Sequence, residues 1–302
     1  MATHEGQPLK SSSIDIGALP MPPVETLWVQ NAKDERLEAA IYRGYHDFTE
    51  ADEPREVFDA RLEYNVPGVL IIPGIPKGGR NNKSETLLSP MFQLYVKHLA
   101  DLGVNSMLMN AAGMGRSEGN TSLESLNSLT NNWVAAAEEL VAHTNTDRWQ
   151  IRLLGNSMGG HVAGSLIERL EQHGMAVDRV ALVSPSFYPK IAQKAKFGHT
   201  FPLARRHFIE FWNLPSYNAL NRYAGRLLIS FSHHDSPPIH PEEMAVAGDA
   251  VAAAIREGRG LSFFSLFVKH NFAPLNKSDQ AQLDVDKTMA ESAAVITNFL
   301  GH

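Results

Sequence analysis

Apolar positions along the chain follow two alternating patterns. Short apolar runs bounded by Gly or Pro are typical of strands buried on both faces, and "PGVLIIPG" at 67–74 is the clearest example. Apolar residues spaced three and four apart are typical of amphipathic helices, as in "SPMFQLYVKHLADLG" at 89–103, which ends at a glycine. The sequence therefore predicts strands that alternate with helices.

The same two patterns predict the remaining elements. Two strands joined by the polar "NAKDE" are expected to form a hairpin near the start. Strands are expected at 25–30, 36–45, 67–74, 105–110, 149–155, 178–186, 225–232 and 262–268. Helices are expected at 89–103, 128–144, 161–174, 248–258 and 291–300. This order predicts an α/β fold with a mostly parallel sheet, helices on both faces and active-site groups at the carboxyl ends of the strands.

Two segments do not fit the alternation. Residues 1–23 are rich in Ser, Pro and Gly without periodicity, and we expect a flexible N-terminal arm. Residues 187–224 interrupt the alternation between two strands and are dense in aromatics, so we expect a small cap insertion. The core would then comprise 24–186 and 225–302.

Composition narrows the classes of function. The 302 residues are 43% hydrophobic, enough for a substantial core, and the net charge of -6 argues against general nucleic-acid binding, which needs a basic surface. The absence of cysteine excludes disulfides, thiolate metal sites and a cysteine nucleophile. Because neither a signal-peptide pattern nor a long apolar window is present, we expect a cytoplasmic protein without a membrane span. Residues 187–224 carry a net charge of +5, against -11 for the remainder.

Two serines lie in the pattern G-x-S-x-G, and their sequence context separates them. Ser157, in "GNSMGG", directly follows the strand at 149–155 and precedes the helix at 161–174. A nucleophile elbow requires this order, because a sharp turn presents the serine and the following helix favours negative charge at its amino terminus. Ser117, in "GRSEG", is followed by loop sequence. We therefore predict Ser157 as an activated nucleophile; the alternative is an ordinary glycine turn.

Four motifs resemble those of the α/β-hydrolase family, from about residue 24 to the end. "LLGNSMGG" resembles the nucleophile elbow of the lipase, esterase and acylglycerol-lipase branches, and "NAAGMGRSEG" is similar to a loop that would give Ser117 a structural role. "SHHDSPP" resembles the loop that bears the acid, and "VKHNF" the loop that bears the histidine. The resemblance implies the α/β-hydrolase fold and a triad of Ser157, Asp235 and His270 in the family's chain order.

The chemistry of this triad is coherent. Imidazole titrates in the range needed to take a proton from a serine hydroxyl, and a carboxylate fixes its tautomer and stabilises the imidazolium. Other carboxylates near Asp235 remain alternatives for the acid: Glu242, Glu243 and Asp249. The adjacent "HHD" also suggests a metal site, but neighbouring loop residues seldom bind one ion, so no metal and no cofactor are expected.

Backbone amides of Met158 and Ile75 are expected to form the oxyanion hole. The family commonly has His-Gly in the loop after the strand at 67–74, whereas this chain has Pro-Gly-Ile, which lacks the histidine but keeps a main-chain donor. "GIPKGGRNNKS" lacks the phosphate-loop spacing, which argues against nucleotide binding. Substrate contacts are expected from Gly74, Asn156, Phe211 and Trp212.

We therefore expect a serine hydrolase that cleaves a small carboxylic ester or thioester through an acyl-enzyme on Ser157, with His270 as base and Asp235 as acid. Acyl transfer, cyclisation or C–C bond cleavage on the same triad is the alternative. A non-catalytic binding module on this scaffold is a further one. Assembly into a homo-oligomer is left open by the sequence.

Overall fold

A single mixed sheet organises the part of the chain that the computed structural model describes, residues 21–44, 65–75, 86–198, 200–205, 215–234, 261–269 and 279–302. Its strand order is β1-β2-β4-β3-β5-β6-β7-β8. The strands are β1 (Val24–Gln30), β2 (Arg36–Tyr42), β3 (Val66–Ile72), β4 (Asn105–Met109), β5 (Thr146–Asn156), β6 (Val177–Val183), β7 (Arg226–His234) and β8 (Leu261–Lys269). All the expected strands are present, and the first two form the expected antiparallel hairpin.

Strand direction decides where a site can lie. β2 is antiparallel to both β1 and β4, whereas β3 to β8 pair in parallel along the rest of the sheet. The carboxyl ends of the parallel strands therefore meet at one edge, where the segments that follow β3, β4, β5 and β6 lie close together. The α/β fold class expected from the sequence is confirmed.

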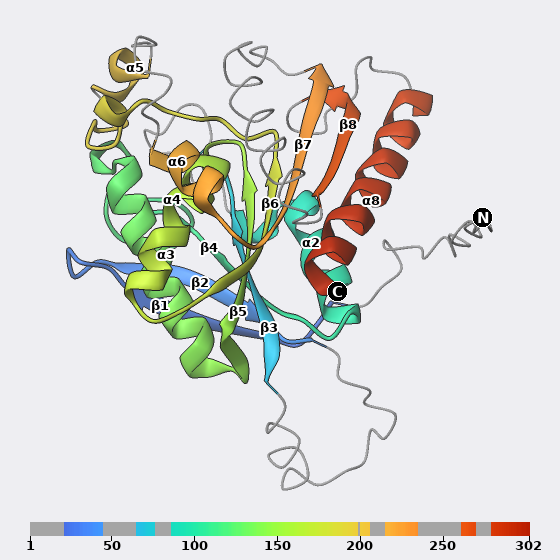
Figure 1. Cartoon of the computed structure of the whole chain (residues 1–302), viewed down its shortest axis with the longest axis horizontal. Helices are drawn as coiled ribbons and strands as arrows, with labels where there is room; N and C mark the ends of the chain where they lie inside the picture. Colours follow the sequence, from blue (N-terminus) through green and yellow to red (C-terminus); the bar gives the residue numbers. More distant parts are fainter. Residues whose placement is uncertain are drawn as a thin grey trace, which may run out of the picture.

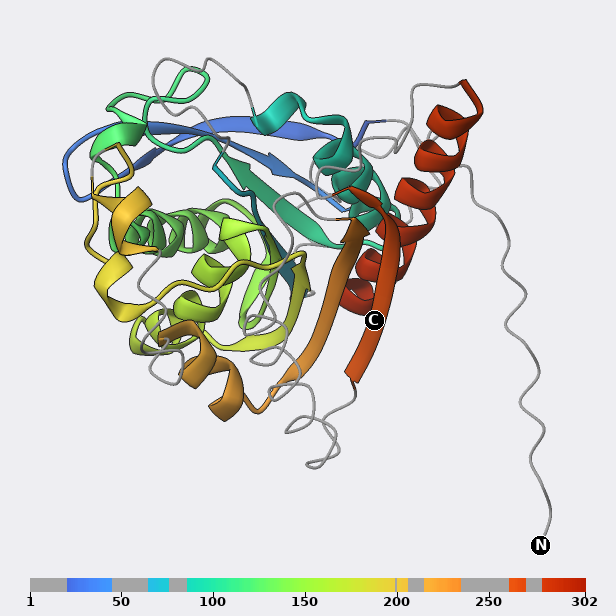
Figure 2. The ribbon, with the colours of Figure 1, turned by 90° about the horizontal axis from the view of Figure 1, so that it is seen from above.

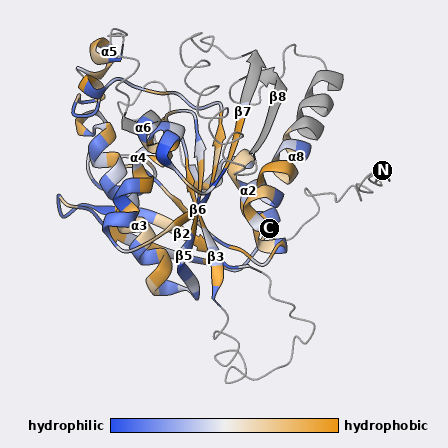
Figure 3. Ribbon diagram, in the orientation of Figure 1, coloured by the Kyte–Doolittle hydropathy of each residue, from blue (hydrophilic) through white to orange (hydrophobic). Residues whose placement is uncertain are grey.

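Helices cover both faces of the sheet (Figures 1 and 2). The described helices are α2 (Pro90–Asp101), α3 (Leu126–His143), α4 (Met158–Gln172), α5 (Phe201–Ala204), α6 (Pro215–Arg222) and α8 (Asp279–Gly301), with 3-10 turns η3 (Thr86–Leu88), η4 (Thr121–Leu123) and η5 (Lys190–Ala192). α3 and α4 pack in one apolar cluster and α2 and α8 in a second. Figure 3 shows the hydrophobic strands between these two layers.

Three helices begin earlier than their sequence pattern predicts. α3 begins at Leu126 because Ser125 caps it, in a capping box with Ser128. α4 begins at Met158, before the expected start at 161, and so includes two glycines that disfavour helix in isolation. α8 begins at Asp279 rather than at 291. The helix expected at 248–258 lies outside the described residues, and α5, α6 and the 3-10 turns are too short for their periodicity to be read.

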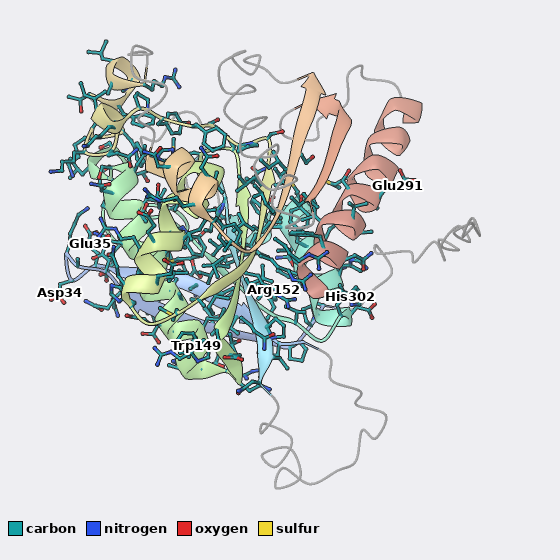
Figure 4. All side chains as sticks on the ribbon, viewed as in Figure 1. Asp34, Glu35, Trp149, Arg152, Glu291 and His302 are labelled. Carbon is teal, nitrogen blue, oxygen red and sulfur yellow. The ribbon has the colours of Figure 1, made fainter. Side chains whose placement is uncertain are left out.

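Buried arginines fasten the end of α8 to the sheet. Arg152 of β5 donates to the carbonyl of Leu300, and Arg179 of β6 donates to that of Phe299 at 2.8 Å. Figure 4 labels Arg152 and the terminal residue His302. Cations at a helix carboxyl terminus satisfy its free carbonyls and complement its dipole. This arrangement fixes α8 on the sheet.

Candidate active site

Ser157 lies in a sharp turn between β5 and α4. Its backbone has φ 56° and ψ -122°, a conformation that side chains with a Cβ rarely adopt, and its side chain is half-buried. The Ser157 amide donates to the carbonyl of Val183 at 2.9 Å, and its carbonyl accepts from the amides of Gly160 and Ser186. The expected order of strand, strained turn and helix is therefore observed.

The glycines around Ser157 are required by close backbone contacts. A Cβ added to Gly155 would lie 2.6 Å from the carbonyl oxygen of Gly159, and one added to Gly159 would lie 2.0 Å from the carbonyl oxygen of Ile72. A Cβ on Gly160 would lie 2.6 Å from the Cβ of Pro185. The turn therefore sits tightly between the ends of β3 and β6.

The residues expected to form the oxyanion hole lie on two sides of Ser157. Met158 is the first residue of α4, so its amide lies at the positive end of the helix, where no acidic side chain of the first turn competes for it. Gly74 lies against the nucleophile: a Cβ there would be 3.0 Å from the Cβ of Ser157 and 3.3 Å from its Oγ. Ile75 follows, half-buried against the same apolar cluster as Met158. Their role as oxyanion donors stays a prediction.

Asn156 lies directly before Ser157 in the chain. It is the last residue of β5 and is buried, and its Nδ2 donates to the carbonyl of Val183 at 3.4 Å. This bond joins β5 to β6 beneath the turn. A substrate contact by its side chain stays a prediction.

Four expected site residues lie outside the described residues: Asp235, His270, Phe211 and Trp212. The described strands lead directly to two of them, since β7 ends at His234 and β8 at Lys269. His234 and Lys269 are register partners in adjacent parallel strands.

Ser117 occupies a structural position. Its side chain is buried, its Oγ donates to the carbonyl of Asn110 at 3.0 Å, and the amide of Glu38 donates to the same oxygen at 2.9 Å. Because this hydroxyl donates to one backbone group and accepts from another, its hydrogen bonds stabilise the loop and do not bind a substrate. The structural role expected for Ser117 is confirmed.

A buried carboxylate organises the loop after β4, and no sequence motif indicated it. Glu38 accepts from the amide of Arg116 at 3.0 Å and from its Nε at 2.6 Å, and Asn110 donates to Glu38 at 3.1 Å. Burial raises the pKa of Glu38, but these hydrogen bonds and the charge of Arg116 outweigh it, and the pKa lies below its usual value. Asn110 also accepts from the amide of Thr86 at 2.9 Å, which fixes the segment before α2.

A narrow cavity, with room for about one water molecule, lies beside Gly74. Most of its lining residues are apolar. The lining residues are Pro73, Gly74, Ile75, Thr86, Met109, Ala111, Met114, Leu129 and Trp133. Trp133 is buried on the face of α3 that packs in the core. The loops after β3 and β4 bring Gly74 and Met114 beside this face.

The described residues lack two further features. No group of His, Cys, Asp and Glu in the described ranges could hold a metal ion. Among the helices in these ranges, none is both long and apolar enough to cross a membrane.

Known proteins share this architecture. The family model described as "Serine aminopeptidase, S33" matches residues 89–225. A Pyrobaculum calidifontis esterase superposes with a TM-score of 0.59 at 13% identity, covering 95% of this chain and 87% of that one. A Pyrococcus furiosus esterase gives 0.58 at 12% identity, covering 93% and 92%. A Bacteroides ovatus chain provisionally assigned as a dipeptidyl aminopeptidase IV gives 0.57 at 18% identity, covering 92% of this chain and 36% of that one.

These likenesses define the fold of the protein. The chain has the α/β-hydrolase fold, and the resemblance to this family that its motifs indicated is confirmed. The family match supports a serine hydrolase. A search of curated protein sequences found no match.

Proposed function

We propose that the protein hydrolyses small carboxylic esters or thioesters through an acyl-enzyme on Ser157. The observation that carries this proposal is the strained backbone of Ser157, with φ 56°, held between the amino terminus of α4 and the close approach of Gly74. Strain of this kind costs of the order of 1–3 kcal/mol and persists at functional sites where the surrounding structure maintains it.

The reaction follows from the proposed roles. His270 takes the proton of the Ser157 hydroxyl as Oγ attacks the ester carbonyl, and the amides of Met158 and Ile75 stabilise the resulting oxyanion. The carbon–oxygen or carbon–sulfur bond then breaks, and the alcohol or thiol leaves with the proton from His270. Water, activated by the same base, releases the acid and restores Ser157. Asp235 orients His270; the ends of β7 and β8 directly before these two residues support their meeting at the edge that holds Ser157.

The side chains around the narrow cavity beside Gly74 favour an uncharged acyl group over a charged one. Its walls at Met109, Met114, Leu129 and Trp133 are hydrophobic, and none of its described lining residues is ionisable. An aminopeptidase, which the family description suggests, must bind a substrate ammonium group, and a buried ammonium requires a carboxylate or other acceptors. The lining therefore favours an ester over an aminoacyl peptide.

Purified protein should be assayed with p-nitrophenyl esters and acyl thioesters of graded chain length, and with aminoacyl p-nitroanilides for comparison. We expect cleavage of the esters or thioesters to exceed that of the anilides by at least about 10², because the described cavity offers the amine no partner. Faster cleavage of the anilides would overturn the ester assignment.

Product analysis in ¹⁸O-labelled water separates hydrolysis from the other reactions of such triads. Hydrolysis places one labelled oxygen in the released acid. Acyl transfer to an added alcohol or amine, or cyclisation, leaves the acyl product unlabelled and would replace hydrolysis as the assigned reaction.

A further inference from the structure

His161 is a fully buried histidine on α4, the helix that begins directly after Ser157, and the proposed reaction does not use it. Its exposed fraction is 0%, and it follows the nucleophile by one turn of α4. Three polar groups surround its ring: the amide of Tyr188 lies 3.1 Å from Nδ1, the hydroxyl of Ser216 lies 2.9 Å from Nδ1, and the side-chain amide of Gln193 lies 2.7 Å from Nε2. All three belong to the described parts of residues 184–225, namely 184–198, 200–205 and 215–225, here called the β6–β7 segment.

The contacts determine the protonation of the ring. The amide of Tyr188 can only donate, so Nδ1 must carry a lone pair and Nε2 must carry the proton. Gln193 then accepts from Nε2 through its amide oxygen, since a side-chain amide can be turned to exchange its oxygen and nitrogen. The ring is therefore neutral, and burial lowers the pKa of His161 to about 4. Its Nδ1 accepts from Tyr188 and Ser216, and its Nε2 donates to Gln193, so one ring joins separate parts of the β6–β7 segment.

Close packing surrounds these polar contacts. A Cβ on Gly160 would lie 2.6 Å from the Cβ of Pro185, and one on Gly164 would lie 2.9 Å from the Cβ of Ser216. The two glycines lie four residues apart on one face of α4, and their lack of side chains lets the start and the end of the β6–β7 segment approach the helix. His161 lies on α4 between these two close contacts.

A row of packed aromatic rings extends from His161 into the β6–β7 segment. The ring of Tyr188 packs edge-on against His161 with centroids 5.3 Å apart, and Phe201 of α5 packs on Tyr188 at 5.0 Å. Phe197 packs on Phe201 in turn. Backbone bonds hold the opposite side, where the amide of Phe197 donates to the carbonyl of Glu124 at 2.9 Å. Backbone bonds thus hold the segment on the η4 turn, and side chains hold it on α4 at two places, His161 and the ion pair of Arg222 with Glu168.

We propose that His161 is a positioning residue that fixes the β6–β7 segment relative to Ser157 and thereby determines which acyl groups reach the nucleophile. The inference rests on the proposed function, and on the expectation that the segment acts as a cap. Because α4 carries both Ser157 and His161, a change at His161 alters the position of the segment without altering the residues that react.

Variants of His161 separate this role from simple core packing. His161→Asn keeps a side-chain acceptor near the position of Nδ1 and loses the contact with Gln193, whereas His161→Leu fills the space without any polar group. His98 supplies the matched control, since it is also buried, at 3% exposed, but lies on α2 with Thr297 of α8 as its partner, in the apolar cluster on the other face of the sheet. His98→Leu should lower stability without any local effect on the β6–β7 segment.

The first measurement is hydrogen exchange followed by mass spectrometry, which requires no activity. In His161→Leu, peptides covering 187–198 should exchange about tenfold faster than in the wild type, roughly the equilibrium change for loss of one net hydrogen bond. Peptides of β5 serve as the internal reference and should be unchanged. His161→Asn should restore most of the protection. The positioning role would be overturned if exchange in 187–198 of His161→Leu rose no more than exchange in β5. It would also be overturned if His98→Leu raised exchange in 187–198 by the same factor.

The second measurement is the ratio of KM values for a long-chain and a short-chain p-nitrophenyl ester. This ratio should change at least about threefold in His161→Leu and return toward the wild-type value in His161→Asn, since a displaced cap alters binding of the larger acyl group most. An unchanged ratio alongside normal ester hydrolysis overturns the proposal. A wild-type protein that cleaves no ester but shows the local exchange effect instead overturns the proposed function, and leaves His161 as the anchor of the segment.

Discussion

Ser157 and Ser117 share a pattern of five residues but have opposite surroundings. Ser157 is half-buried at φ 56°, with a Gly74 backbone against its Oγ, whereas Ser117 is buried with both hydrogen-bonding directions of its hydroxyl occupied. Sequence context distinguished them because a strand directly before a serine and a helix directly after it can be recognised from apolar spacing. The Glu38 network that holds the second loop could not be recognised, because Glu38 lies 78 positions from Arg116 and 72 positions from Asn110, and no local pattern connects residues so far apart.

Replacing Ser157 should separate strain from chemistry. Ser157→Ala and Ser157→Gly both remove the hydroxyl, so kcat should fall by roughly 10³ or more in each. Glycine also relieves the positive φ, so Ser157→Gly should be more stable than Ser157→Ala by about 1 kcal/mol. Urea unfolding of the two variants measures this difference. Equal stability would mean that the turn is not strained.

Ser117→Ala is the matched control for the nucleophile. It leaves the buried amide of Glu38 without its acceptor, so the free energy of unfolding should fall by about 1–3 kcal/mol. Its kcat should stay within about threefold of the wild type, because a structural serine affects catalysis only through the stability of the fold. A loss of activity as large as that of Ser157→Ala, in folded protein, would contradict the assignment.

Acid should weaken the fold partly through His161. Its pKa is about 4 in the native state, and a histidine in the unfolded chain titrates near 6.5. Between these values the unfolded chain binds a proton that the native ring excludes, so this contribution to stability is complete above about pH 6.5 and is lost as the pH falls toward 4. The full effect is about 3 kcal/mol. The buried His98, whose pKa burial also lowers, contributes in the same direction.

His161→Asn should remove this part of the pH dependence. Urea unfolding of wild type and variant at pH 7 and pH 4.5 should show a smaller loss of stability on acidification in the variant, by up to about 3 kcal/mol. The contribution of His98 is common to both proteins and cancels. Parallel losses in wild type and variant would show that the native ring is not held neutral.

At the scale of elements, α4 shows what local sequence predicts and what it misses. The helix was expected from 161 because Gly159 and Gly160 disfavour helical structure, yet it begins at Met158, where the ends of β3 and β6 leave room for nothing larger than glycine. Tertiary contact therefore outweighs propensity at the position where the chemistry needs a helix terminus. The short α5 and α6 were missed because four and eight residues are too few for a period to be recognised.

Glycine variants of α4 should differ by what each added methyl group meets. Gly159→Ala places a Cβ 2.0 Å from a backbone carbonyl oxygen that cannot rotate away, so it should cost at least about 3 kcal/mol of stability. Gly164→Ala meets the side chain of Ser216 at 2.9 Å and should cost about 1–2 kcal/mol, with the exchange increase confined to the β6–β7 segment. Thermal and urea unfolding measure both values. A Gly159→Ala protein as stable as Gly164→Ala would contradict the packing at the turn.

For the whole molecule, the strands, the mostly parallel sheet and the helices on both faces could be predicted from the alternation of patterns, whereas the order of the strands and the contacts between distant residues could not. The eight strands and the two-sided helix layers were predicted from period alone. The cavity beside Gly74 was not, because it joins the ends of β3 and β4, the loop after β4 and the α3 helix, which lie far apart in the sequence. The same holds for the link between His161 and Ser216.

Charge is also distributed unevenly over the molecule. Residues 187–224 carry +5 and the remainder -11, and within the described part of this region Lys190, Lys194, Lys196 and Arg205 are exposed. If these cations attract an anionic substrate, Lys190→Gln, Lys194→Gln and Arg205→Gln combined should raise KM for an anionic ester about threefold more than for a neutral one. The difference should shrink between 0.02 and 0.3 M salt, as screening requires. Equal effects on both esters would mean that the charges only solvate the surface.

The identity of the nucleophile is the claim on which the proposed function depends. Folded protein should be treated with a fluorophosphonate probe, digested, and mapped by mass spectrometry, with Ser157→Ala and Ser117→Ala treated in parallel. We predict one label per chain, carried by the peptide that contains Ser157, lost in Ser157→Ala and retained in Ser117→Ala, because only an activated serine hydroxyl attacks the probe at neutral pH. Labelling at Ser117, or no labelling of the folded wild type, would contradict the account.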